Sequence, residues 1–116
     1  MATPPKIIAP ISFDMTTGRM TGPAGSIVLS PAMRALASCF WRHGEKTAFP
    51  FSVAQEVLWP EGAALPADPE QVFRHDLREL RIVTRALSFG GESALDFRQD
   101  KQRNWLVTSR KTGGRP

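Results

Sequence analysis

The sequence predicts an α+β domain with short N-terminal antiparallel strands, three helices and a C-terminal β-hairpin. Three observations predict it. Short apolar runs divided by turn residues come first, three segments with helical periodicity follow, and two alternating segments around a polar tip come last. With 116 residues and 41% hydrophobic content, the chain is long enough for one domain with a modest core.

Two strands are predicted at residues 7–13 and 19–29, and the turn-forming sequence at 16–18 separates them. A further turn is expected at 23–25, where proline and glycine precede an apolar triplet. Residues 1–6 are expected to form a loose leader. The sequence therefore predicts a small antiparallel sheet, and it leaves the register of that sheet open.

A first helix is predicted to begin at Ser30-Pro31 and to end at Gly44. The serine hydroxyl can accept a hydrogen bond from a free backbone N–H, and proline is well suited to the first helical position. Cys39 is the single cysteine, so it cannot form an internal disulfide and favours a reducing compartment. We expect it to fill space in the core and not to act as a nucleophile. The apolar residues that share one face of this helix are Met33, Leu36, Ala37, Phe40 and Trp41.

A second, shorter helix is predicted after Ser52, which forms a capping box with Gln55 three residues later. Trp59 is expected to close this helix because Pro60 cannot continue it. The following segment, 60–69, is rich in proline and should form a rigid, exposed loop.

The third helix is the segment on which the functional prediction depends. It is predicted over 68–87, with Asp68 as its cap. At about 100° per residue its side chains separate into three faces. The face expected to be buried carries Phe73, Leu77, Leu80 and Thr84. A second face, here called the arginine stripe, places four guanidinium groups within about 60° of one another: Arg74, Arg78, Arg81 and Arg85. The third carries His75, Asp76 and Glu79.

The arginine stripe has two interpretations. All four arginines can project outward toward a polyanion, or they can form an ordinary solvated face with ion pairs at helical spacing. The helix itself is balanced, because four acidic residues accompany the four arginines between 68 and 87. Intramolecular pairing of these arginines, or their burial beneath the hairpin, would count against nucleic-acid contact.

The C-terminal hairpin is predicted from alternation. Leu95 and Phe97 alternate with polar residues, a polar tip follows at 100–104, and apolar residues return at 105–108. We therefore place the domain at 7–109 and a flexible basic tail at 110–116.

The charge is unevenly distributed. The chain carries +4 overall with a pI near 10.0. Residues 97–116 contain six basic residues and one acidic residue, a net +5, so the first 96 residues carry −1. This asymmetry favours an anionic partner, although a basic tail alone gives the same totals. No apolar run approaches the roughly 20 residues needed to cross a membrane, and no signal peptide is visible, so a cytoplasmic location without a membrane partner is expected.

The order of strands, three helices and a basic-tipped hairpin is that of a winged helix-turn-helix domain. Over about 11–108 the sequence resembles the OmpR/PhoB-type DNA-binding effector domain of bacterial response regulators. The segments that carry the resemblance are ISFDMTTGRMTG followed by IVLSPAMRAL, then FSVAQEVLWP with Ser52 and Trp59, then FRHDLRELR with Phe73, Leu77, Leu80 and Arg81. The family hairpin usually reads Gly-x-Gly-Tyr. Here both glycines are missing before Trp105, so the tip should differ in shape.

The resemblance implies a stand-alone, nucleoid-associated regulator of transcription, since no receiver domain is visible in the sequence. Its third helix would enter the major groove of double-stranded DNA, and its wing would touch the backbone or minor groove. Arg81 would clamp a phosphate, and the wing residues would attract the backbone without regard to sequence. The candidate DNA-binding residues are Gln71, Arg74, His75, Arg78, Arg81, Arg85, Lys101 and Arg103.

The same resemblance leaves a second function open. The family uses the loop between its second and third helices to touch RNA polymerase, so the chain could be a protein-interaction module that acts through loop 60–69. Its candidate residues are Trp59, Glu61, Leu65 and Asp68. A second copy bound to the same DNA is a further candidate partner. An enzyme is not predicted: no glycine-rich phosphate loop and no Cys/His metal spacing occurs, so we expect no cofactor, metal or catalytic residue.

Overall fold

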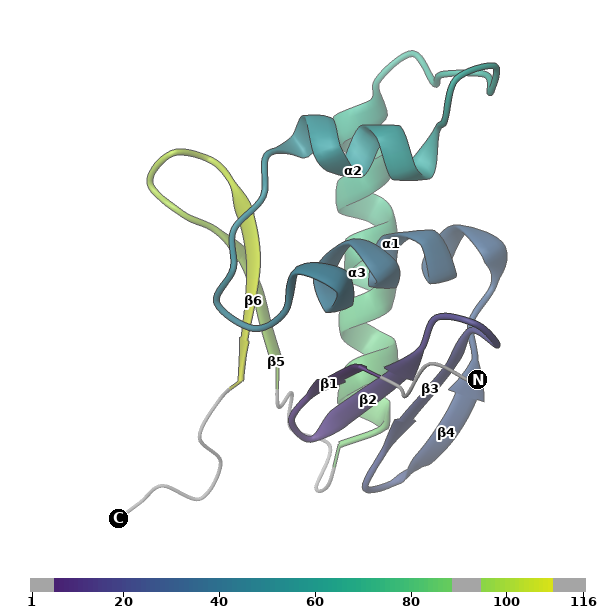
Figure 1. Ribbon diagram of the computed structural model, residues 1–116, viewed down its shortest axis with the longest axis vertical. Helices are drawn as coiled ribbons and strands as arrows, with labels where there is room; N and C mark the ends of the chain where they lie inside the picture. Colours follow the sequence, from purple (N-terminus) through teal and green to yellow (C-terminus); the bar gives the residue numbers. More distant parts are fainter. Residues whose placement is uncertain (1–5, 89–94, 110–116) are drawn as a thin grey trace.

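The computed structural model describes residues 6–88 and 95–109, which form an α+β arrangement of three helices, a four-stranded antiparallel sheet and a two-stranded hairpin (Figure 1). The sheet contains β1 (Lys6–Ile8), β2 (Ile11–Asp14), β3 (Arg19–Gly22) and β4 (Gly25–Val28) in chain order. The helices are α1 (Pro31–His43), α2 (Phe51–Leu58) and α3 (Pro69–Ala86), and β5 (Leu95–Gln99) with β6 (Trp105–Ser109) forms the hairpin. Helix α3 runs behind α1 and α2, with the hairpin beside it (Figure 1).

The N-terminal sheet contains four strands where the sequence predicted two. The predicted strand 7–13 is wrong as a single element, because Pro10 lacks the N–H that a continuing ladder needs and the chain turns there. Ile8 therefore pairs with Ile11 across the turn. The prediction 19–29 is likewise divided, at the expected turn around 23–25. Lys6 belongs to β1 and not to a leader.

The first helix agrees with its local signals. Ser30 accepts a hydrogen bond from the Met33 N–H at 3.4 Å, and the helix ends at Gly44, whose φ is 90°. Of the predicted stripe only Met33 is incompletely buried. The Trp41 indole donates to the Ile11 carbonyl at 3.3 Å and so ties α1 to the sheet. Cys39 is buried as expected, and that burial raises the pKa of its thiol to about 11.

The second helix begins earlier than predicted. The prediction of a capping box at Ser52 is wrong. The helix starts at Phe51, with Pro50 at the cap position and no side-chain cap. The reason is a contact with a residue distant in the sequence. Phe49 exchanges both backbone hydrogen bonds with Trp105, at 2.9 and 2.8 Å, which holds the chain extended up to the proline. The predicted end at Trp59 is confirmed.

The third helix matches its prediction closely. The Asp68 carboxylate accepts from the Gln71 N–H at 3.1 Å, and Pro69 occupies the first position. The helical residues that are buried are the four predicted: Phe73, Leu77, Leu80 and Thr84. The sequence SFGG at 88–91 predicts a turn after α3, and its last three residues lie outside the described residues, as does the expected tail at 110–116.

The core joins all three helices to both sheets. The Phe40 ring lies 5.1 Å from that of Phe49 and 4.9 Å from that of Phe97, both edge-on, so α1 contacts the chain before α2 and the hairpin together. Phe73 continues this cluster to Trp105, at 4.9 Å between ring centres. Across the described ranges, no helix combines the length and apolar character that a bilayer crossing requires.

Candidate functional site

The arginine stripe of α3 faces the hairpin. A groove of about 300 Å³ lies between α3 and β5, and no pattern in the sequence points to it directly. The arginines therefore stand beside a second element and not on an isolated helix face. The groove is lined by Arg78, Arg81, Ile82 and Arg85 from the helix and by Leu95, Asp96 and Phe97 from the strand.

Arg74 binds the base of the hairpin tip. Its guanidinium lies 3.2 Å from the Glu70 carboxylate, 3.4 Å from the side-chain oxygen of Gln99, and 5.3 Å from the ring centre of Trp105. The side chain is still 49% exposed, so the ion pair with Glu70 is a solvated one of small energy. Arg74 thus has three partners within the protein, two of them on the hairpin.

Arg81 binds the hairpin backbone. One of its terminal nitrogens donates to the Phe97 carbonyl at 2.6 Å. Phe97 is paired with Val107, whose carbonyl accepts from the Lys46 N–H outside the hairpin. In such a pair both carbonyls point outward, so the Phe97 carbonyl points away from β6. Arg81 therefore satisfies an acceptor on the outer edge of β5. Arg85, which is exposed, also has an interaction partner.

Each of the two interpretations of the arginine stripe holds for some of its members: all four arginines are exposed, but Arg74 and Arg81 also bind groups within the protein. Arg74 and Arg81 contact the hairpin because α3 packs lengthwise against β5, a relation that helical spacing cannot reveal. Arg78 is exposed and forms no hydrogen bond or ion pair with any residue in 6–88 or 95–109. Within the stripe, Arg74 and Arg81 therefore bind the hairpin, whereas Arg78 has no such contact.

A second set of α3 residues overlaps the arginine stripe at Arg78, and its members Arg78 and Ile82 both line the groove beside β5. The residues of this set recur at spacings of four, three and four on the side opposite the buried face, and each is exposed. Ile82 is 57% exposed, an unusual position for a large apolar side chain, and sequence analysis did not select it. The sequence does indicate this position, because Ile82 lies one turn after Arg78 and outside the apolar periodicity of the buried face. We call this set the outward stripe: Gln71, His75, Arg78 and Ile82.

Two acidic residues of α3, Asp76 and Glu79, lie to one side of the outward stripe. Asp76 is half-buried, with a side chain 21% exposed, and its carboxylate is 3.6 Å from the exposed His75 ring. Glu79 is exposed on the same side. These two carboxylates lie away from the arginine stripe, whereas Glu70 pairs with Arg74 on the hairpin side of the helix.

The hairpin tip is closed by Asp100 and not by glycine. The Asp100 carboxylate accepts from the N–H groups of Gln102 and Asn104, each at 2.9 Å, and Arg103 adopts a φ of 66°. Asp at the start of a turn is a recognisable signal, because its side chain readily bonds the backbone two residues on. Lys101 and Arg103 are exposed as a result.

The tip is also connected to α3. The Gln99 amide nitrogen donates to the Arg103 carbonyl at 3.1 Å, while its oxygen accepts from Arg74 at 3.4 Å. A chain of contacts therefore runs from helix to tip through Gln99. The two elements that carry the candidate residues hold each other in place.

The loop between α2 and α3 presents a smaller candidate surface. Leu65 is 54% exposed and Glu61 is exposed, whereas Trp59 is partly buried. Asp68 is exposed, but its carboxylate caps α3, so it already has a structural role.

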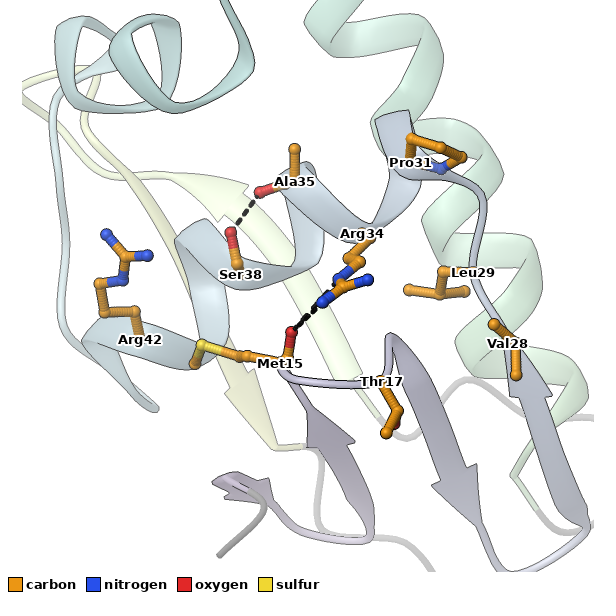
Figure 2. A pocket seen from close by; sticks show the side chains of 9 residues that line it. All are labelled: Met15, Thr17, Val28, Leu29, Pro31, Arg34, Ala35, Ser38 and Arg42. Atoms are coloured by element: carbon orange, nitrogen blue, oxygen red, sulfur yellow. Dashed lines mark hydrogen bonds between the residues drawn. The ribbon is translucent and has the colours of Figure 1, made fainter. Parts of the chain in front are cut away.

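A separate hollow of about 380 Å³ lies between α1 and the turn that joins β2 to β3 (Figure 2). Its central residue, Arg34, donates to the Met15 carbonyl at 3.2 and 2.7 Å and to the Thr16 carbonyl at 2.6 Å. These bonds make Arg34 a clamp on the turn. The guanidinium is largely satisfied, so we assign this hollow a structural role.

The sequence matches no model of a known protein family and no curated protein. Within the described ranges, no group of three or more His, Cys, Asp or Glu side chains could hold a metal ion.

Proposed function

We propose that the protein is a transcription regulator that binds double-stranded DNA through a winged helix-turn-helix domain of the OmpR/PhoB type. The observation that carries the proposal is the outward stripe of α3, standing beside a hairpin whose tip exposes Lys101 and Arg103. The element order also supports it, since an antiparallel sheet, three helices and a hairpin are what the resemblance implies.

The geometry suits a helix lying in the major groove. An α-helix fits that groove, and its base edges present donors, acceptors and thymine methyl groups. Arg78 has its full set of N–H donors available for guanine O6 and N7. At the tip, Lys101 and Arg103 attract phosphates without regard to sequence.

The arginines that contact the hairpin keep a secondary role. A guanidinium has five N–H donors, and Arg81 gives one terminal nitrogen to the Phe97 carbonyl. Its remaining donors and its charge still attract phosphate. In this proposal Arg74, Arg81 and Arg85 strengthen binding by charge, while Gln71, His75 and Arg78 approach the bases.

The test begins with selection of bound duplexes from a random DNA pool, followed by measurement of Kd at several salt concentrations. Arg78→Ala should weaken binding to the selected site roughly ten- to hundredfold, the range of one bidentate guanine contact. Arg42→Ala is the matched control, because Arg42 is an exposed arginine on α1, and it should change Kd less than about twofold.

The wing is tested separately. Replacing both Lys101 and Arg103 by alanine should reduce the slope of log K against log salt by roughly 1.8, about 0.9 for each phosphate that the variant no longer neutralises. If no duplex is enriched at low salt, or if Arg78→Ala binds as tightly as the parent, the proposed function is wrong.

A second candidate function rests on Leu65, which is 54% exposed in loop 60–68. We propose that this loop docks on RNA polymerase. Leu65→Asp should abolish co-elution with purified polymerase in the absence of DNA and leave DNA affinity unchanged. Retained co-elution by the variant would refute this docking surface, and Ile7→Asp, at a similarly exposed isoleucine on β1, is the control.

A further inference from the structure

We propose, on the basis of the DNA-binding function above, that Arg78 and Ile82 read a guanine and a thymine methyl group one or two base pairs apart. Both residues belong to the outward stripe, and both are exposed. They stand four residues apart on α3, which is about 6 Å along the helix and about 40° around it. Two adjacent exposed side chains, which also line the groove beside β5, therefore present one cation and one apolar group.

The chemistry of these two side chains selects different base edges. Arginine can donate two parallel hydrogen bonds to guanine O6 and N7. Isoleucine cannot donate or accept a hydrogen bond, and the one apolar group that a base presents in the major groove is the C5-methyl of thymine. Burial of the exposed apolar area of Ile82 is favourable against the thymine methyl group and not against the polar groups of the other base edges.

The neighbouring arginines are less suited to reading bases. Arg74 is held by Glu70, Gln99 and the Trp105 ring, and Arg81 by the Phe97 carbonyl. These contacts lie on the hairpin side of α3, away from the centre of the outward stripe. Arg78 is therefore better placed than Arg74 or Arg81 to read a base, and Ile82 lies one turn after it on the same stripe.

The spacing of the two contacts follows from the rise per residue of the α-helix and the rise per base pair of the duplex. About 6 Å separates the two side chains along the helix axis, and successive base pairs are about 3.4 Å apart along the duplex. A helix lying along the groove therefore places the two contacts one or two base-pair steps apart. The selected site should contain a guanine and a thymine at that separation.

The experiment removes single groups from the DNA. In the selected duplex each thymine is replaced in turn by uracil, which lacks only the methyl group, and each guanine by 7-deazaguanine, which lacks only the N7 acceptor. One uracil position should weaken binding of the parent protein about three- to fourfold. Ile82→Ala should weaken binding similarly and become insensitive to that same replacement. Likewise, replacing one guanine by 7-deazaguanine should weaken binding of the parent protein, and Arg78→Ala should be insensitive to that replacement.

The controls separate this inference from the proposed function. Ile82 is exposed and alanine is a better helix former, so the variant should keep its fold. Ile7→Ala, at another exposed isoleucine, should retain full sensitivity to uracil. If the parent binds the duplex but every uracil replacement leaves Kd unchanged, or if Ile82→Ala keeps the parent's sensitivity, the proposed reading of bases by Arg78 and Ile82 is refuted. The proposal of DNA binding then still stands. If no duplex binds at all, both proposals fail.

Discussion

Replacing Arg81 by alanine should destabilise the fold, whereas the same replacement at Arg78 should not. Arg81 donates to the Phe97 carbonyl at 2.6 Å, and Arg78 has no partner among the described residues. A hydrogen bond from a charged donor contributes about 1.5–3 kcal/mol, and the exposure of Arg81 favours the lower end of that range. We expect a loss of about 1–2 kcal/mol for Arg81→Ala and less than about 0.5 kcal/mol for Arg78→Ala.

The assay is urea unfolding followed by tryptophan fluorescence, since Trp41 and Trp105 are buried in the folded protein. At an m-value of about 2 kcal/mol/M, a loss of that size should lower the midpoint by roughly 0.5–1 M. The two variants remove the same charge from the same helix, so general electrostatic effects cancel in the comparison. Equal midpoints for both variants would show that the Arg81 contact does not support the hairpin.

Three further predictions concern other parts of the structure. Phe73→Ala removes a fully buried ring between Phe51 and Trp105 and should cost about 3–5 kcal/mol of unfolding free energy, measured by the same urea titration; a loss below about 1 kcal/mol would contradict the assigned core. The folded pKa of Cys39 is raised from 9.0 to about 11, so its contribution to stability should be complete below pH 9 and decline as the pH rises toward 11; Cys39→Ala should remove that decline, and an unchanged pH profile would refute the assignment. Asp100→Ala should speed amide hydrogen exchange at residues 102 and 104, while Asp100→Asn, which keeps an acceptor, should retain most of the protection; equal exchange in both variants would show that the carboxylate does not close the tip.

The elements with strong local signals could be predicted from the sequence. Helix α1 has Ser30 at its start and Gly44 at its end, and α3 has Asp68 as its cap, so the helical periodicity between these signals predicted the buried faces correctly. Local signals act over three or four residues, which is the range that a single sequence reveals without knowledge of the fold.

The errors came from contacts between distant residues. The start of α2 depends on the pairing of Phe49 with Trp105, and that pairing overrides the local capping signal at Ser52. The arginine stripe was correctly placed on one face of α3, but the hairpin partners of Arg74 and Arg81 depend on how that helix packs. Of the candidate site, the positions of the side chains were predictable, and their division between hairpin support and solvent was not.

The contact between Arg81 and Phe97 has a consequence for solubility. A two-stranded hairpin has two outer edges, and an uncovered edge is a template onto which a strand from another molecule can add. The Lys46 and Phe49 backbones occupy one edge, and the Arg81 guanidinium occupies the midpoint of the other. The same side chain that binds the hairpin therefore covers part of this edge, and Arg81→Ala should aggregate faster at high concentration than Arg78→Ala.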